Sequence, residues 1–169
     1  MKKMNRNAIF WRVVSGELPL PPAAETLGWQ FMDYDEGSGE MHIAYAAETA
    51  LTNPLGNIQG GILSAMLDDC MGPAIYATLP PNKIAVTVES RTLFIHPASP
   101  GRILGTGKID HIKGNLCFTS GKLWDTNGQL LATATAIFRI GNLRWNGLTI
   151  PSPVANGLMK WKLRQLKKD

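Results

Sequence analysis

The sequence has few of the residues that build disulfide frameworks and metal sites, and it has no long hydrophobic run. It contains two cysteines and three histidines among 169 residues, and Cys70 lies far from Cys117. Because no C-x-x-C or H-x-x-x-H spacing occurs, we expect reduced, buried thiols and no metal site. No apolar stretch approaches the roughly 18 residues of a membrane-spanning helix, so we expect no integral membrane segment.

Motifs of several enzyme classes are also absent. The chain has no G-x-S-x-G nucleophile elbow. It has neither a G-x-G-x-x-G fingerprint for dinucleotides nor a P-loop for nucleotide phosphates. The basic start of the chain leads into an apolar stretch, 8–14, that Arg12 interrupts. This pattern differs from that of a signal peptide, and we therefore expect a cytoplasmic protein.

Charge is unevenly distributed along the chain. The net charge is +4, but residues 142–169 hold six Lys and Arg residues against Asp169 alone, and the remainder is close to neutral. This distribution argues against a basic groove that binds nucleic acid. A basic C-terminus can attract an anionic ligand, a membrane surface or an acidic partner. A basic C-terminal segment is more commonly a solvated surface helix, and we favour this interpretation.

Hydrophobic periodicity predicts the order of the elements. We expect a short helix within 1–16, a proline-rich linker at 18–22, strands at 28–33 and 40–46, a long helix from 59 to about 72, and strands at 84–96, 101–112, 116–125 and 129–140. Pro73 is expected to kink or end the long helix. Short links between strands imply an antiparallel sheet, and one long helix can cover a face of it. The last strand is apolar or small on both faces, which indicates close packing, with another subunit as one candidate.

The most informative segment runs from 53 to 70. It combines a polar turn, a glycine pair, the start of an apolar helix and a pair of carboxylates. Backbone N–H groups at a helix start are unpaired donors, and the helix dipole favours negative charge there. Glycines would let a ligand approach these donors closely. A carboxylate on the same helix could then act on the polarised group, an arrangement suited to attack on a carbonyl.

A helical wheel separates the two carboxylates. Asp68 shares a stripe of otherwise small residues, whereas Asp69 lies about 100° away, so we expect the two not to point at the same atom. We assign the functional role to Asp68. Cys70 falls on the apolar face and is expected in the core. From the residues alone, a helix with two surface aspartates stays an open alternative, as does a plain turn at Asn53, which precedes a proline.

These residues resemble the motif of the hotdog-fold thioesterases, in their phenylacetyl-CoA thioesterase (PaaI-like) branch. In that branch Asn is followed by His-Gly-Gly and then by Asp in the helix; this chain has Asn53, Gln59-Gly60-Gly61 and Asp68. The resemblance covers roughly 26–140. It implies a single α+β hotdog domain, in which a curved antiparallel sheet wraps a long central helix. It leaves 1–25 as an N-terminal helix and linker, and 141–169 as a basic C-terminal extension.

The resemblance also implies an activity. We expect hydrolysis of acyl-CoA thioesters to free acid and coenzyme A, without a metal or redox cofactor. Homodimers joined through their sheet edges, or homotetramers made of two such dimers, are expected. One alternative is a non-catalytic acyl-CoA-binding protein. Another is a hydratase or dehydratase on the same fold, which we rank lower because the chain lacks a well-placed His for proton transfer.

Catalytic roles follow from the resemblance at five positions. The Gly60 N–H would polarise the thioester carbonyl, and Asp68, reaching across a dimer interface, would activate water or attack the carbonyl itself. Asn53 would orient the water or the carbonyl, and Thr87 would assist the water. Gln59 stands where the family usually has His; its amide can donate a hydrogen bond but does not titrate near neutral pH.

Substrate contacts are expected around these groups. The candidates are Gly61, Ser64, Met66 and Phe94, with Trp29 and Tyr76 as further candidates for the acyl tunnel.

Overall fold

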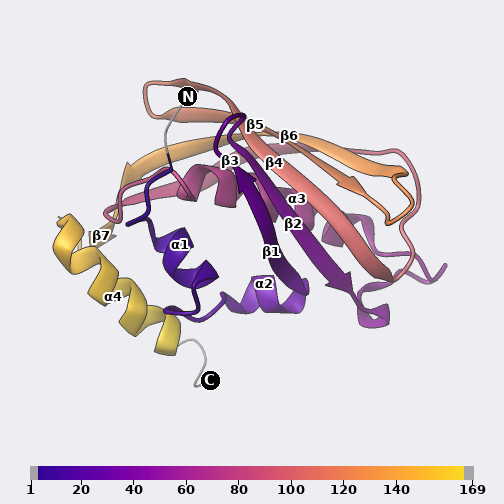
Figure 1. Cartoon of the computed structure of the whole chain (residues 1–169), viewed down its shortest axis with the longest axis horizontal. Helices are drawn as coiled ribbons and strands as arrows, with labels where there is room; N and C mark the ends of the chain where they lie inside the picture. Colours follow the sequence, from indigo (N-terminus) through magenta and orange to yellow (C-terminus); the bar gives the residue numbers. More distant parts are fainter. Residues whose placement is uncertain (1–3, 166–169) are drawn as a thin grey trace.

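The computed structural model describes residues 4–165. A long helix, α3 (Gly60–Tyr76), packs against one six-stranded antiparallel sheet that curves around it (Figure 1). The strands are β1 (Trp29–Asp35), β2 (Glu40–Ala47), β3 (Lys83–Phe94), β4 (Gly101–Lys113), β5 (Leu116–Trp124) and β6 (Leu130–Asn142). Their order in the sheet is β1-β2-β4-β5-β6-β3. This architecture confirms the predicted α+β fold with a central helix.

The contact between helix and sheet depends on apolar side chains and on glycine. Leu63, Leu67 and Cys70 lie on the sheet-facing side of α3 and are buried, as the wheel predicts. On β4, a Cβ atom added to Gly107 would lie 2.3 Å from the carbonyl oxygen of Cys70. Only a residue without a side chain permits this close approach. The middle of α3 is therefore held firmly on the sheet.

The prediction for Pro73 needs a correction. The helix does not end there but continues to Tyr76, with the proline inside it. Proline cannot donate a hydrogen bond to the carbonyl four residues earlier, which destabilises an isolated helix. Here Ala74 and Ile75 in the following turn are completely buried. Their packing offsets the lost hydrogen bond and extends α3.

Three helices and a small hairpin lie outside the sheet. They are α1 (Ile9–Val14), α2 (Pro22–Thr26), the hairpin of β7 (Arg144–Trp145) and β8 (Leu148–Thr149), and α4 (Ser152–Gln165), while a short 3-10 helix, η1 (Thr49–Leu51), precedes α3. In Figure 1, α1 and α4 lie side by side at one end of the molecule. No helix among residues 4–165 has the length and apolar character needed to cross a membrane.

The sheet ends at β1 and at β3. The final large strand, β6, lies between β5 and β3, and its small residues Ala132, Ala134 and Ala136 are buried in the core. Contact of this strand with another subunit stays a prediction. The outer strand β3 is different, because Val86 and Val88 are 56% and 53% exposed. An exposed apolar sheet edge is a surface to which another chain can add.

Candidate active site

The start of α3 carries free backbone donors. Gln59 precedes the helix, and its own N–H donates to the carbonyl of Leu51 over 2.9 Å. The next two N–H groups, of Gly60 and Gly61, have no acceptor within residues 4–165. The positive end of the helix dipole lies at these donors. The helix start can therefore bind a carbonyl oxygen or an anion.

Asn53 shapes the loop that leads into this helix. Its side-chain oxygen accepts hydrogen bonds from the N–H groups of Leu55, at 2.9 Å, and Asn57, at 3.3 Å. These bonds form a turn that brings the chain back to pair Thr52 with Ile58. Asn53 is thus a turn former in this chain. Its amide nitrogen makes no hydrogen bond to another described residue and is available to a ligand.

A phenyl ring lies against the first glycine of the pair. A Cβ atom on Gly60 would come within 3.2 Å of the Phe94 ring, whereas the space around Gly61 is open. Phe94 is 52% exposed at the end of β3, and Ser64 is half-buried one turn along the helix. Three of the expected substrate contacts, Gly61, Ser64 and Phe94, therefore lie at the N-terminal half of α3.

Asp68 and Thr87 form a hydrogen-bonded pair between α3 and β3. The Thr87 hydroxyl donates to Asp68 Oδ1 over 2.9 Å. Burial raises the pKa of the Asp68 carboxyl, and the hydrogen bond from Thr87 lowers it. A partly desolvated carboxylate oriented by a hydroxyl has the properties of a general base.

Asp69 is the more buried of the two carboxyl groups. Its Oδ2 atom is inaccessible and has no hydrogen-bond partner among the described residues. Burial, followed by the charge of Asp68, raises the pKa of Asp69 to about 7. At neutral pH this group therefore exists in both protonation states.

A cavity of about 350 Å³ borders both carboxyl groups. Its volume is within the range of small-molecule sites. The wall combines α3 and the sheet with the N-terminal segment, residues 9–24, and with α4. It is lined by Ile9, Phe10, Val13, Leu20, Pro21, Ala24, Trp29, Asp68, Asp69, Gly72, Pro73, Tyr76, Ala85, Thr87, Phe138 and Met159. Among residues 4–165, Asp68 and Asp69 carry the only charged side chains that line it.

The free donors and Asp68 lie on one helix but far apart. Gly60 precedes Asp68 by eight residues, which corresponds to about 12 Å along the helix axis. This distance is too long for one thioester to use both groups of the same chain. Its carbonyl oxygen cannot accept a hydrogen bond from Gly60 while its carbonyl carbon is attacked beside Asp68. A single chain thus holds two half-sites: the donor half-site, Asn53, Gln59 and Gly60, and the base half-site, Asp68 and Thr87.

Comparison with known proteins identifies the family. The model described as "Thioesterase superfamily" matches residues 55–132. A phenylacetic acid degradation-related protein from Ralstonia eutropha JMP134 is 36% identical, with a TM-score of 0.74, over 77% of this chain and 98% of that protein. The chain belongs to the hotdog-fold thioesterases, in their PaaI-like branch.

Two further solved structures resemble this PaaI-like thioesterase. The PaaI protein of the E. coli phenylacetic acid degradation operon shares the fold, with a TM-score of 0.68 and 17% identity over 79% of this chain and 95% of that one. A Bacillus halodurans protein solved with CoA has a TM-score of 0.57 and 25% identity, over 59% of this chain and 66% of that one. No curated protein matches this chain.

The structure separates the acyl-tunnel candidates of this thioesterase. Trp29 and Tyr76 line the cavity beside Asp68. Phe94 lies at the donor half-site instead. Met66 is completely buried, and its carbonyl accepts a hydrogen bond from the Tyr45 hydroxyl. Its side chain is part of the core, and a substrate contact at Met66 stays a prediction.

The helical wheel also gave an incomplete view of the carboxyl groups. Asp68 and Asp69 do project from different stripes of α3, yet both line one cavity. The opposite wall of that cavity comes from the N-terminal segment and Met159 of α4, which wrap around the helix. Asp69 is the site-lining residue that the sequence interpretation set aside. The available signal was a second carboxylate in a helix predicted to end near residue 72, where the dipole would disfavour negative charge.

Both cysteines of this thioesterase are buried. Cys70 is completely buried, and burial raises the pKa of its thiol well above the usual range. This confirms the prediction that Cys70 belongs to the core. Within residues 4–165, no three His, Cys, Asp or Glu side chains gather closely enough to hold a metal ion.

Proposed function

We propose that this protein hydrolyses acyl-CoA thioesters at sites that combine the donor half-site of one chain with the base half-site of another. The observation that carries the proposal is the pairing of Asp68 with Thr87 at the middle of α3, with unpaired N–H donors at the N-terminal end of the helix. Family membership supports thioester hydrolysis, and the CoA bound to the B. halodurans neighbour supports a coenzyme A thioester as the substrate.

Asp68 would act as the general base in this reaction. It takes a proton from water as the water oxygen bonds to the thioester carbonyl carbon, while the Gly60 N–H of the other chain stabilises the oxyanion. The tetrahedral intermediate then collapses, and the C–S bond breaks. The leaving thiolate receives the proton from Asp68, which yields the free acid and coenzyme A. The Thr87 hydroxyl keeps Asp68 oriented and favours its ionised form.

The second chain would join at the free edge of β3. This strand ends the sheet, and it presents exposed apolar residues beside Thr87. Pairing two β3 edges would bury this surface in a symmetric dimer. Homodimers, alone or paired into tetramers, are the assembly we propose. A cytoplasmic location remains our prediction.

Gln59 is the residue that decides between hydrolase and binder. Its side chain is exposed and makes no hydrogen bond to another described residue. The amide can donate to the thioester carbonyl without titrating, which is compatible with turnover. A non-catalytic acyl-CoA binder is the second candidate, favoured only by the absence of the family's usual His at this position.

Replacing Asp68 tests the proposal. Asp68→Asn keeps the shape of the side chain but not its basicity, and we expect kcat to fall by about 10²- to 10⁴-fold with unchanged circular dichroism. Asp33→Asn, an exposed change on β1, is the control and should leave kcat unaffected. Near wild-type turnover by Asp68→Asn would remove Asp68 from the mechanism. Binding without turnover by the wild type, over short, aromatic and long acyl chains, would establish the binder.

A further inference from the structure

A second group of exposed apolar side chains, besides the β3 edge, lies on the β7–β8 hairpin and on α4. Trp145 and Leu148 of the hairpin are 40% and 72% exposed, and Val154 and Trp161 of α4 are 56% and 51% exposed. Of the five tryptophans in the chain, only Trp145 and Trp161 are exposed. None of the four side chains lines the cavity beside Asp68. Apolar side chains gathered on a surface mark a site of interaction.

These four side chains form one continuous surface, the tryptophan patch. Trp145 meets Trp161 edge to face, with ring centroids 5.9 Å apart and an interplanar angle of 82°. Leu148 is the strand partner of Trp145, so the two side chains lie on the same face of the hairpin. Val154 lies two helical turns before Trp161 and within about 20° of it around the axis of α4.

The tryptophan patch is held in place from beneath. The hairpin turns at Asn146 and Gly147, whose φ angles of 48° and 81° fit a tight two-residue turn. Ala155 of α4 is completely buried, and Met159 lines the cavity. Met159 lies about 160° from Trp161 around the helix. One side of α4 therefore packs on the protein, and the other side carries the patch.

Cations border the tryptophan patch on both sides. Lys162 lies about 100° from Trp161 around the helix on one side, and Arg164 about 60° away on the other. Lys160 adjoins Trp161 in the chain, and Arg144 belongs to the hairpin. The hairpin and α4 contain no Asp or Glu. The surface thus combines exposed apolar groups with positive charge alone.

One carboxylate near these cations is already bound. The Glu17 side chain accepts a hydrogen bond from Arg12 Nε over 2.9 Å. This bond, with a smaller effect from the Lys160 charge, lowers the pKa of Glu17. The positive charge of the hairpin and α4 is therefore left largely for an external anion.

We propose that the tryptophan patch and its bordering cations dock this protein on the surface of an anionic lipid bilayer. The two indoles would lie at the level of the lipid headgroups, where Trp is enriched. Lys and Arg would contact the lipid phosphates, and α4 would lie in the plane of the interface without crossing it. Docking would bring the cavity, which Met159 lines, within one helix of the bilayer. This surface does not depend on the proposed hydrolysis.

The residue types favour a lipid surface over a protein partner. Trp and Arg are enriched in protein interfaces, but Lys is depleted there. Here Lys160 and Lys162 lie beside the exposed Trp161. An anionic bilayer attracts each cation without requiring a matched partner. A narrow apolar stripe with long cationic side chains on either side also lets the charges reach the headgroups while the stripe enters the interface.

Co-sedimentation with large unilamellar vesicles tests this docking surface. The full-length protein is mixed with vesicles of phosphatidylcholine, either pure or with about 30% phosphatidylglycerol, at about 0.1 M salt. We expect the anionic vesicles to bind the protein at least about 10-fold more tightly than the neutral ones. Added salt should weaken the binding. Lipids with brominated chains should quench the fluorescence of the bound protein.

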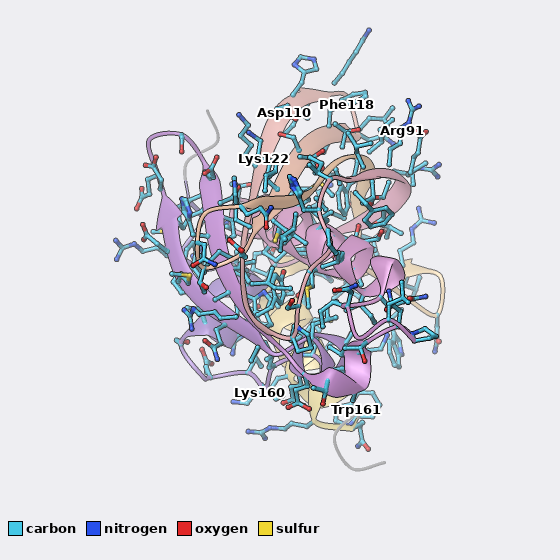
Figure 2. All side chains as sticks on the ribbon, turned by 90° about the vertical axis from the view of Figure 1, so that its right-hand side faces the viewer. Arg91, Asp110, Phe118, Lys122, Lys160 and Trp161 are labelled. Atoms are coloured by element: carbon cyan, nitrogen blue, oxygen red, sulfur yellow. The ribbon has the colours of Figure 1, made fainter. Side chains whose placement is uncertain are left out.

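Two triple variants with the same change in net charge make the test specific. Replacing the three cations of α4 by Gln should weaken binding to the anionic vesicles by about 100-fold, since each cation contributes about fivefold. These cations are Lys160, Lys162 and Arg164. The control replaces three exposed lysines of β4 and β5, Lys108, Lys113 and Lys122, and should weaken binding by less than about threefold. In Figure 2, Lys122 lies at the opposite end of the view from Lys160 and Trp161.

The apolar contribution is tested separately. Trp161→Gln should weaken binding by about 10-fold and reduce the quenching, with unchanged circular dichroism. Met32→Gln changes an exposed apolar residue of β1 and should keep the wild-type affinity.

Equal binding of the wild type to anionic and neutral vesicles would overturn the proposal. So would equal binding by the two triple variants. Absence of vesicle binding, together with a smaller assembly of Trp161→Gln by light scattering, would assign the patch to contact between copies of this chain instead. Absence of vesicle binding with an unchanged assembly would leave an acidic protein as the partner and would also refute the lipid surface.

Discussion

The Thr87 hydroxyl donates a 2.9 Å hydrogen bond to Asp68 Oδ1 and so joins the outer strand of the sheet to the central helix. The bond stabilises the charged form of a carboxyl group whose pKa burial raises. In the proposed mechanism Asp68 is the general base and must be ionised to act, so we expect this bond to influence the pH at which the reaction begins.

Removing this hydroxyl should move the pH dependence of the rate. In Thr87→Val the Asp68 carboxylate loses its donor, and its pKa rises further. The acidic limb of the kcat/KM profile, where the rate increases as Asp68 ionises, should shift to higher pH, and kcat should fall by about 10-fold.

Two variants make this measurement specific. Thr87→Ser keeps the hydroxyl and should retain the wild-type profile. Thr92→Val makes the same change elsewhere on β3 and should also retain it. An acidic limb that stays in place in Thr87→Val, or moves to lower pH, would separate Thr87 from the ionisation of Asp68.

Asp69 should make the stability of the protein depend on pH. The folded state raises its pKa from 3.8 to about 7. Its ionisation therefore destabilises the fold increasingly as the pH rises from about 4 to about 7. Asp69→Asn cannot ionise, so it should raise the free energy of unfolding at pH 8 by up to about 4 kcal/mol, at roughly 1.4 kcal/mol per pKa unit.

Denaturant unfolding of wild type and Asp69→Asn at pH 4 and pH 8 gives this comparison. The gain should be much smaller at pH 4, because the Asp69 side chain of the folded wild type is then neutral, as Asn is. Asp33→Asn serves as the exposed control, with no gain at either pH. A variant that is less stable than the wild type at pH 8 would mean that the Asp69 carboxylate is favourably paired.

We expect the C-terminal helix, α4, to form part of the cavity wall and not to bind the phosphates of coenzyme A. Met159 of α4 lines the cavity. Figure 2 shows Lys160 and Trp161 of this helix at the opposite end of the view from Arg91 and Lys122. Changing Lys160, Lys162 and Arg164 together to Gln should leave KM for acyl-CoA within about twofold, as expected for solvated charges.

Deleting 152–169 removes the wall as well as the charges. The deletion should raise KM, because Met159 no longer closes the cavity. A large, salt-dependent rise in KM for the triple Gln variant would instead assign the basic residues to the coenzyme A phosphates. Lys167, Lys168 and Asp169, also part of the predicted basic extension, lie outside the described residues.

The sequence predicted local features well and those that depend on distant segments poorly. The alternation in β2 and the apolar stripe of α3 are local patterns, and both elements formed where expected. The helical continuation through Pro73 depends on buried packing that periodicity does not reveal. Asp69 lines the cavity because α1, the linker and α4 cover that side of α3. No sequence pattern predicts where such terminal segments pack.

The two half-sites show the same difference between local features and features that depend on distant segments. The helix start at Gly60 and the position of Asp68 follow from spacing, because a helix has a fixed rise per residue. The bond between Asp68 and Thr87 depends on which strand lies beside the helix, and only the family resemblance indicated Thr87 beforehand. The separation of Gly60 from Asp68 is the reason why we propose a second chain at each site.

Complementation between two inactive variants tests this two-chain site. Asp68→Asn removes the base. Gly60→Pro removes the N–H donor at the first helical position, which proline tolerates well. Gln59 already has the extended backbone, φ −59° and ψ 136°, that a following proline requires. Phe94 can turn away from the added ring because it is half exposed. Each variant alone should be folded and inactive.

The decisive measurement is the activity of the two variants co-expressed in equal amounts. Each site draws its donor and its base from different chains, so about a quarter of the sites should combine an intact Gly60 with an intact Asp68. We predict about a quarter of the wild-type specific activity. Activity no higher than that of the separate variants, in a preparation shown to contain mixed oligomers, would contradict the two-chain site.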